Sequence, residues 1–257
     1  MKSNYFQKLV ALNKSRKIFK NWNICAKLYL NQIKDRFAIL ETRTNKKIKV
    51  RTDTTDFMAL ANIWLLEDYK IKKFEINSDD VIIDIGAHIG IFTIYASQFC
   101  NNGKIFCFEP IQENYKMLIE NININQIKNI YPNNLAVTKD TSTAKIFLND
   151  DKSGHSMFIE NKSFVQVDSK SLFDVFADNR IEECNFLKLD CEGAEYEIIE
   201  SLPSDFFSKI DKTVIEYHMA DTKPELLEGL IKKLKQLSFT IHTRPLFSDI
   251  GFLFARK

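Results

Sequence analysis

The sequence predicts an α/β fold with a mostly parallel seven-stranded sheet, which carries a pair of antiparallel strands at its C-terminal edge. Three observations support this prediction. From residue 79 onward, short apolar runs alternate with helical patterns, as they do in the βαβ units of a parallel sheet. The last two apolar runs, residues 239–245 and 251–257, have no helix between them, and they therefore form a hairpin. The first 78 residues lack this alternation and are expected to form an extension.

The extension, residues 1–78, is predicted to contain a helix and a hairpin, and residues 79–257 form the main domain. Apolar residues at positions 18, 22, 25, 29 and 33 recur every three or four residues, which predicts an amphipathic helix. Residues 36–41 and 47–51 flank a polar turn at 44–46 and predict a β-hairpin. Thr55 or Asp56 is placed to cap a following helix that runs to Leu66.

In the main domain, strands and helices follow one another in a regular order. Buried strands are predicted from apolar runs, and helices from apolar residues spaced by three or four. A proline is placed at the first turn of the last helix, where its missing N–H costs nothing. Strands are expected at residues 81–84, 104–110, 129–137, 144–148, 164–167, 186–190 and 213–218, and helices at 91–99, 114–124, 195–201 and 224–237.

The composition is that of a globular protein, with 45% hydrophobic and 27% charged residues. No apolar run approaches the roughly 18–20 residues of a membrane span, and the N-terminus does not read as a signal peptide. A cytoplasmic protein is therefore expected. Five cysteines, an odd number without C-x-x-C spacing, predict reduced thiols rather than disulfides or structural zinc.

Positive charge is concentrated at the N-terminus. Residues 1–36 hold nine Lys or Arg and one acid, Asp35, although the net charge of the whole chain is only +2. Apolar residues alternate with these lysines, so residues 1–34 could contact a membrane surface or dock as a helix with a solvated basic face. Because the charge is confined to this arm and no aromatic RNA-binding motif is present, binding of nucleic acid is not favoured. The oligomeric state is left open.

A glycine-containing turn follows the first buried strand. It reads Asp84-Ile-Gly86-Ala-His-Ile-Gly90, and a glycine here lets a ligand lie against the main chain. An NAD-dependent oxidoreductase would carry G-x-G-x-x-G. This spacing is absent, so the turn favours a different adenosine cofactor with an amino-acid moiety, such as S-adenosylmethionine. A plain α/β turn remains the alternative.

Acidic residues follow three other strands. Glu109 ends the strand about 20 residues after the glycines, where a carboxylate can accept the hydroxyls of a ribose. Further acids end the fourth and fifth buried strands. Because ligands of open α/β sheets bind outside the carboxyl ends of the strands, these groups are expected to share one rim. They are Asp190, Glu192 and Glu195 in KLDCEGAE, and Glu216 and His218 in IEYH.

Taken together, these motifs resemble the FkbM-type methyltransferases. VIIDIGAHIGIFTIYAS, KIFCFEP, ENININ, SLFD after VQVDS, LKLDCEGAE and VIEYH occur in that order over roughly residues 79–218. The resemblance implies a class I methyltransferase fold, which is Rossmann-like, and transfer of a methyl group from S-adenosylmethionine to a hydroxyl of a glycan, glycolipid or related small metabolite. It also implies cofactor contacts by the turn and by the second acid, at Asp84, Gly86, Ala87, His88, Gly90 and Glu109.

The same resemblance places Asp190, Glu192 and Glu195 on the acidic motif of the family. His88 and Cys191 depart from it, since they stand where Asn and an aliphatic residue are more usual.

The reaction needs a general base near the acceptor hydroxyl. Asp190 or His218 is the expected base, with Glu216 to orient it. Glu192, Glu195 and the loop residue His155 are candidates for binding the acceptor. A divalent metal held by the same side chains is an open alternative, but no tight ligand spacing favours it. A non-catalytic protein that binds the cofactor also stays open.

Overall fold

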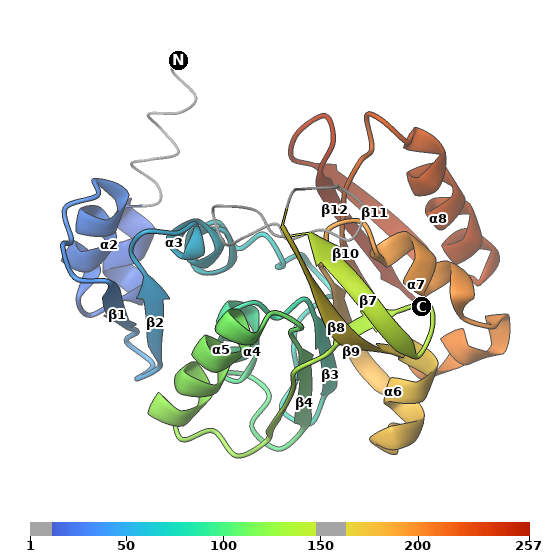
Figure 1. Cartoon of the computed structure of the whole chain (residues 1–257), viewed down its shortest axis with the longest axis horizontal. Helices are drawn as coiled ribbons and strands as arrows, with labels where there is room; N and C mark the ends of the chain where they lie inside the picture. Colours follow the sequence, from blue (N-terminus) through green and yellow to red (C-terminus); the bar gives the residue numbers. More distant parts are fainter. Residues whose placement is uncertain (1–11, 148–162) are drawn as a thin grey trace.

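The computed structural model describes residues 12–147 and 163–257. A seven-stranded sheet runs through the molecule in the order β11-β12-β10-β9-β3-β4-β5 (Figure 1). β12 is antiparallel to β10 and β11, and the other neighbouring pairs are parallel. The predicted sheet and its antiparallel edge pair are thus confirmed. The strands are β3 (Val81–Ile85), β4 (Lys104–Phe108), β5 (Ile130–Asn133), β9 (Cys184–Leu189), β10 (Ile210–Tyr217), β11 (Thr240–Pro245) and β12 (Gly251–Arg256).

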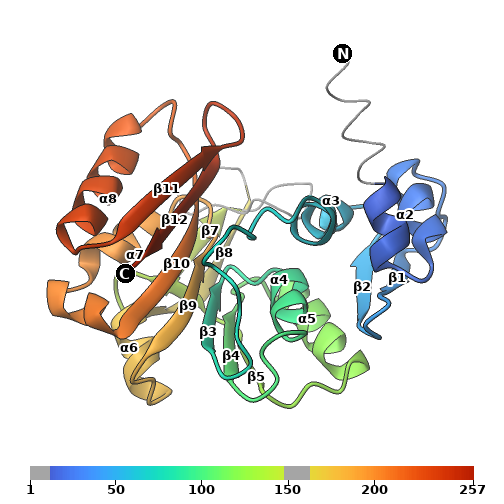
Figure 2. The same ribbon diagram turned by 180° about the vertical axis from the view of Figure 1, so that it is seen from behind.

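Helices cover both faces of this sheet (Figure 2). α4 (Ile91–Ala96) and α5 (Gln112–Ile124) lie on one face, and α6 (Leu172–Asp178), α7 (Glu195–Ser201), the 3-10 helix η2 (Ser204–Lys209) and α8 (Pro224–Gln236) lie on the other. Successive strand residues point to opposite faces. Ile82 accordingly belongs to the core cluster that includes residues of α4 and α5, and Ile83 to the cluster on the other face.

The extension consists of a helix at residues 12–18, α2 (Trp22–Tyr29), the hairpin of β1 (Phe37–Glu41) and β2 (Lys47–Arg51), and α3 (Asp56–Leu60) continued by the π-helix η1 (Ala61–Leu66). The predicted hairpin is confirmed. The amphipathic helix expected over residues 18–33 is confirmed for Trp22–Tyr29. It begins later than expected, because Phe19 is fully buried and forms a β-bridge with Thr42, and it ends before Ile33. Neither Thr55 nor Asp56 caps α3 with its side chain.

Two asparagines of α5 attach the hairpin to the main domain. Asn121 accepts a hydrogen bond from the backbone N–H of Lys49 and donates one to its carbonyl, at 2.7 and 3.1 Å. Asn125 does the same for Lys47. These amides satisfy the open edge of β2, which would otherwise leave backbone groups unpaired. Residues of the hairpin, such as Leu40, share one hydrophobic cluster with Ile82 of β3.

The predicted strand over residues 129–137 is two strands in different sheets. β5 ends at Asn133, and the side chain of Asn134 donates to the carbonyls of Glu109 and Pro110. The chain then enters β6 (Ala136–Thr138), which joins β7 (Ser142–Phe147) and β8 (Phe164–Ser171) in a three-stranded sheet. His155 lies outside the described residues.

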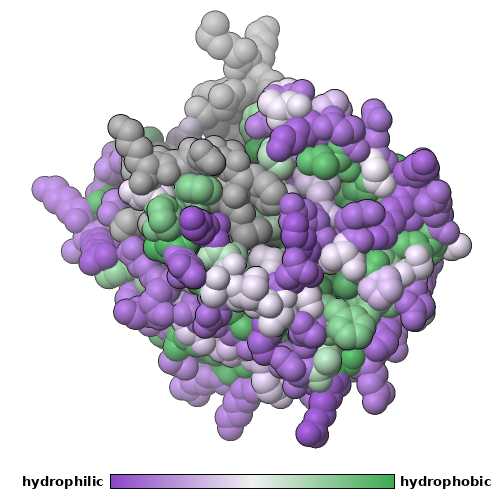
Figure 3. Space-filling model, turned by 45° about the vertical axis from the view of Figure 1, so that its right-hand side comes forward, coloured by the Kyte–Doolittle hydropathy of each residue, from purple (hydrophilic) through white to green (hydrophobic). Residues whose placement is uncertain are grey.

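The surface mixes polar and apolar groups. Figure 3 shows one face on which hydrophilic residues predominate and hydrophobic residues form small separate patches. Within residues 12–147 and 163–257, no helix has both the length and the apolar character that a membrane crossing requires. All five cysteines are free thiols, as expected, and four of them are buried.

Candidate active site

A cavity of about 330 Å³ opens at the carboxyl ends of β3, β4, β9 and β10. Its floor comes from the main domain, and part of its wall comes from α3, η1 and the turn after them. The sequence-predicted residues that line it are Gly86, Ala87, His88, Glu109, Asp190, Glu192 and Glu216. The extension adds Thr55, Met58, Ala59, Asn62, Ile63 and Tyr69. None of these six was singled out from the sequence as a site residue, because no motif surrounds them.

The two glycines of the first turn have different tasks. Gly86 has φ +76°, and a Cβ there would lie 1.7 Å from the carbonyl oxygen of Asp190. It therefore allows the turns after β3 and β9 to touch at the edge of the cavity. Gly90 has φ +85°, and a Cβ there would lie 2.5 Å from Leu118. Gly90 lets α4 approach α5 and does not line the cavity, contrary to the expected cofactor contact.

Asp84 supports the turn from behind. Its side chain is fully buried and accepts a hydrogen bond from Thr93 at 2.6 Å. The Nζ atom of Lys188, also buried, lies 3.0 Å from the other carboxylate oxygen of Asp84 and donates to the carbonyl of Gly86. Although burial favours a neutral amine, Asp84 and Asp190 raise the pKa of Lys188 above its ordinary value. Asp84 thus fixes the turn through Lys188 and is not among the residues that line the cavity.

Glu109 lies at the cavity wall with its carboxylate fixed by two backbone groups. One oxygen accepts from the N–H of His88 at 2.8 Å, and the other from the N–H of Ile111 at 2.9 Å. Burial raises the pKa of Glu109 to about 7, against these hydrogen bonds, which favour the ionised form. Oε1 also accepts from Nδ2 of Asn114 at 3.4 Å, whereas Oε2 keeps a second lone pair for a ligand donor.

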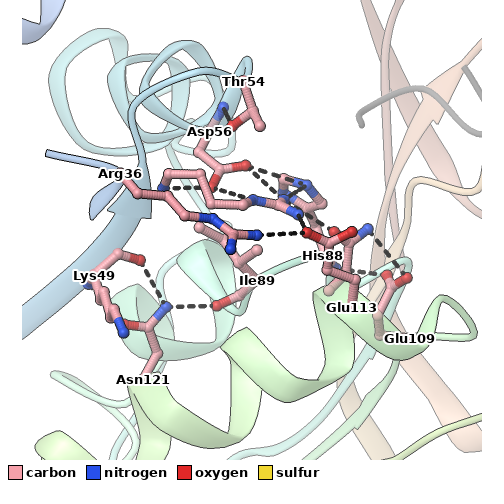
Figure 4. Close-up of polar contacts among 11 residues, drawn as sticks. Arg36, Lys49, Thr54, Asp56, His88, Ile89, Glu109, Glu113 and Asn121 are labelled. Carbon is pink, nitrogen blue, oxygen red and sulfur yellow. Dashed lines mark hydrogen bonds and ion pairs between the residues drawn. The ribbon is translucent and has the colours of Figure 1, made fainter. Parts of the chain in front are cut away.

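His88 links the glycine turn to the extension (Figure 4). Its Nε2 atom lies 3.2 Å from Nη2 of Arg51 and 3.5 Å from Oδ1 of Asp56. Arg51 and Asp56 form a fully buried pair with two side-chain hydrogen bonds, and Arg51 also donates to Asn114 of α5. His88 therefore joins the cavity wall to a buried ion pair of the extension, a role that its place in the sequence did not reveal.

Asp190 and Glu216 lie side by side in the cavity lining. β9 and β10 are paired with Leu189 beside Ile215, so the residues that follow these two are neighbours. The hydroxyl of Tyr69 lies 3.1 Å from Oδ2 of Asp190 and 3.0 Å from Oε2 of Glu216. Burial, together with the charge of Asp190, raises the pKa of Glu216 to about 8.

His218 and Glu195 lie behind this pair. Glu195 is fully buried and accepts hydrogen bonds from the N–H groups of Gly193 and His218. Its Oε1 atom is 3.1 Å from Nδ1 of His218, and Nε2 of His218 is 3.5 Å from Glu192. Burial opposes charge on the imidazole, but Glu195 and then Glu192 raise the pKa of His218 to about 10.

Glu195 and Glu192 thus favour the protonated imidazole of His218, so Asp190, the other expected base, is the stronger candidate. Glu195 orders the turn and is not among the residues that line the cavity. One ligand atom from each of Asp190, Glu192 and His218 lies within 4.8 Å of the others, close enough to surround a cation. A histidine binds metal only when neutral, so a divalent metal here would have to displace the proton that Glu195 and Glu192 favour on His218.

Comparisons with known proteins identify the family. Residues 84–252 match the family described as the methyltransferase FkbM domain. Methyltransferase 1 of Beauveria bassiana is 25% identical over 56% of this chain, and the match spans 66% of that protein, just under two thirds. Methyltransferase sdnD of Sordaria araneosa is 22% identical over 74% of this chain and 88% of that protein.

Solved structures give weaker matches. A precorrin-6y C5,15-methyltransferase of Geobacter metallireducens has 14% identity and a TM-score of 0.48, covering 81% of this chain and 92% of its own. Aeropyrum pernix fibrillarin with natively bound S-adenosyl-L-methionine has 13% identity and a TM-score of 0.46, covering 86% and 94%. Both scores lie below 0.5, so the assignment rests on the family match and the strand order. The chain belongs to the FkbM methyltransferase family and is an S-adenosylmethionine-dependent methyltransferase.

Proposed function

We propose that this protein methylates a hydroxyl group of a glycan, a glycolipid or a related small metabolite. The observation that carries the proposal is that the glycine turn, Glu109, Asp190 and Glu216 all line one cavity. The turn and Glu109 suit an adenosine cofactor, and the carboxylates of Asp190 and Glu216 suit proton removal. Methylation of a hydroxyl requires the cofactor-binding groups and a proton acceptor in the same cavity.

The cofactor-binding part of the cavity fits S-adenosylmethionine by its shape and its polar groups. Oε2 of Glu109 offers an acceptor lone pair to a ribose hydroxyl. Ile111, Val137 and Ile146 supply an apolar wall for an adenine ring. The main-chain atoms of Gly86 and Ala87 border the space next to this wall. Because Gly86 has no side chain, a ligand can approach its backbone closely. The expected contacts of Gly86, Ala87, His88 and Glu109 therefore stay part of the proposal.

Asp190 is the proposed base. When bound, S-adenosylmethionine would supply an electrophilic methyl group to the acceptor oxygen and would leave as S-adenosylhomocysteine. Asp190 takes the proton of the acceptor hydroxyl, and Glu192, at the cavity rim, is placed to bind another hydroxyl of the acceptor. A positioned base contributes about 10²–10⁴-fold, and alignment of the two reactants supplies much of the remainder.

Calorimetry tests the cofactor half of the proposal. The protein is titrated with S-adenosylmethionine and, separately, with NADH. Binding of S-adenosylmethionine is expected, and it should weaken in Asp84→Ala, because Lys188 loses its partner and the turn moves. Asp205→Ala, an exposed acid of η2, is the matched control and should bind as the wild type does. A preference for NADH would sink the proposal.

A screen with methyl-labelled cofactor tests the acceptor half. Glycans, glycolipids and small polyhydroxy metabolites are offered, and label in an ether linkage is the expected product. Transfer that persists in EDTA would dismiss a divalent metal. Cofactor binding without transfer to any hydroxyl acceptor would favour a non-catalytic role. Contact of residues 1–34 with a membrane stays a separate prediction, tested by vesicle binding with and without those residues.

A further inference from the structure

Tyr69 belongs to the extension, outside the residues 84–252 that match the family, yet it reaches the centre of the site. The ring is buried between Phe92 and Phe252, with centroids 5.2 and 5.0 Å away. Its hydroxyl lies between Asp190 and Glu216, at hydrogen-bond distance from both. The ring packing leaves the hydroxyl little freedom to turn toward anything else.

The number of hydrogens at this point is informative. A phenol has one O–H, so it can donate to only one of the two carboxylates. Burial, followed by the charges of Asp190 and Glu216, raises the pKa of Tyr69 well above its ordinary value, so the phenol keeps its hydrogen. The second short contact therefore needs a hydrogen from a carboxyl group. Without it, an oxygen of one carboxylate would face the phenol oxygen at about 3 Å with no hydrogen between the two atoms, which is unfavourable.

The surrounding charges decide which carboxyl group carries that hydrogen. Nζ of Lys188 lies 3.4 Å from Asp190 and compensates its charge. The imidazolium of His218 is engaged by Glu192 and Glu195, and Glu216 has no cation as close as Lys188 is to Asp190 among the described residues. Burial and the charge of Asp190 raise the pKa of Glu216, so Glu216 is the carboxyl group that carries the hydrogen. The chain of donors thus runs from Glu216 to Tyr69 and from Tyr69 to Asp190.

We propose that Tyr69 is a positioning residue, whose hydroxyl joins a protonated Glu216 to an ionised Asp190 and so keeps Asp190 ready to accept the proton of the acceptor. This inference rests on the proposed function for its catalytic meaning, but the proton arrangement itself is a property of the free protein. It also gives the extension a part in the reaction.

Carbon-13 NMR of the protein, labelled at the side-chain carboxyl of glutamate, tests the arrangement without cofactor or acceptor. The signal that is missing in Glu216→Gln is assigned to Glu216. It should titrate near pH 8. In Tyr69→Phe its midpoint should fall by about one pH unit, because the protonated carboxyl group of Glu216 loses the phenol oxygen that accepts its hydrogen. Tyr95→Phe, which removes a phenol packed on the same Phe92 ring, should leave it unchanged. A wild-type midpoint near the ordinary value of about 4.3, or no shift in Tyr69→Phe, would overturn the proposal.

The second part of the test measures methyl transfer by the same variants to an acceptor that the screen has identified. The amide of Glu216→Gln can donate to Tyr69 as the protonated acid does, so this variant should keep more activity than Glu216→Ala, whose side chain has no donor. Asp190→Asn should lose about 10²–10⁴-fold. Tyr69→Phe should move the acid limb of kcat/KM to higher pH by about one unit, without weakening cofactor binding. The reverse pattern, with Glu216→Gln inactive and Asp190→Asn active, would contradict the assignment. If the wild type transfers no methyl group while the NMR result holds, only the proposed function fails.

Discussion

The carboxyl groups around the cavity differ in what compensates their charge. Asp84 has Lys188 at 3.0 Å, and Asp190 has the same cation at 3.4 Å. Glu109 has only backbone donors and Asn114 as direct partners among the described residues. Desolvation disfavours the ionised form of a carboxyl group unless a charge or donors offset it. For this reason, carboxyl groups that occupy similar places in the sequence differ in how readily they ionise.

Glu109 should make stability depend on pH. Its pKa in the folded protein is about 7, above the ordinary 4.5, so the folded state binds more protons than the unfolded state between these values. The free energy of unfolding should therefore fall as pH rises through this window, by about 3 kcal/mol. Glu109→Gln should remove that part of the decline in urea titrations from pH 4 to 8. Glu120→Gln, an exposed acid of α5 paired with Lys49, is the control, and identical slopes in wild type and Glu109→Gln would contradict the prediction.

Lys188 should be among the costliest polar residues to replace. Lys188→Met leaves Asp84 buried without its cation, and breaking a buried pair in this way costs about 3–5 kcal/mol. Removing both charges in Asp84→Asn/Lys188→Met should recover part of the loss, since no unpaired charge remains. Chemical denaturation measures all three variants. Lys139→Met, which breaks the exposed pair with Glu197, should change little. Equal losses in the single and double variants would mean that packing, not charge, is responsible.

The residues of the site could be predicted from the sequence where they end strands of one sheet. Asp190 and Glu216 are neighbours because β9 and β10 are adjacent and in register. Tyr69 could not be predicted, since its partners lie 121 and 147 residues away and no periodic pattern surrounds it. His218 ends a strand as expected, but its protonation depends on Glu195 and Glu192. The sequence therefore predicts which strand end carries a charged residue, but it does not predict which side chains pair with that residue.

At the scale of elements, close contact between turns explains where glycine is required. Gly86→Ala would place a Cβ 1.7 Å from a backbone oxygen at φ +76°, so the turns after β3 and β9 must separate. We expect Gly86→Ala to destabilise the fold and to lose cofactor binding. Gly229, in the exposed middle of α8, has nothing within 4 Å of an added Cβ. Gly229→Ala should therefore stabilise the protein by about 0.5–1 kcal/mol.

Thermal unfolding and calorimetry with S-adenosylmethionine check both glycine variants. Wild-type cofactor affinity in Gly86→Ala would show that the turns separate without affecting the site. A loss of stability in Gly229→Ala would show that α8 packs more tightly there than its exposure indicates.

Element boundaries were predicted well where burial follows the period of a strand or helix, as in β3 and α8. They failed where a tertiary contact interrupts a continuous pattern. Phe19 leaves a helical pattern because it pairs with Thr42, and Asn134 splits an apolar run because its side chain binds the turn after β4. Both interruptions come from partners at least 23 residues away, so local periodicity carries no sign of them.

At the scale of the molecule, the extension is built into the main domain. One hydrophobic cluster contains Phe19, Leu40 and Trp64 of the extension together with residues of β3, α4 and α5. The extension also supplies Arg51 and Asp56, which hold His88, and Tyr69, which contacts Asp190 and Glu216. Packing and site thus depend on the same segment, although the division at residue 79 stays a prediction.

A chain that begins at residue 79 tests how far that dependence goes. Its α4 and α5 would expose apolar side chains that the extension covers, and its site would lack Tyr69 and the Arg51–Asp56 pair. We expect it to aggregate or to unfold without a cooperative transition, and to bind no S-adenosylmethionine, in calorimetry and gel filtration. A chain that lacks only residues 1–11 keeps every contact described above and is the matched control. If residues 79–257 folded cooperatively and bound the cofactor as tightly as the full chain, the extension would be an independent unit, and a role for Tyr69 would have to be sought in the acceptor step alone.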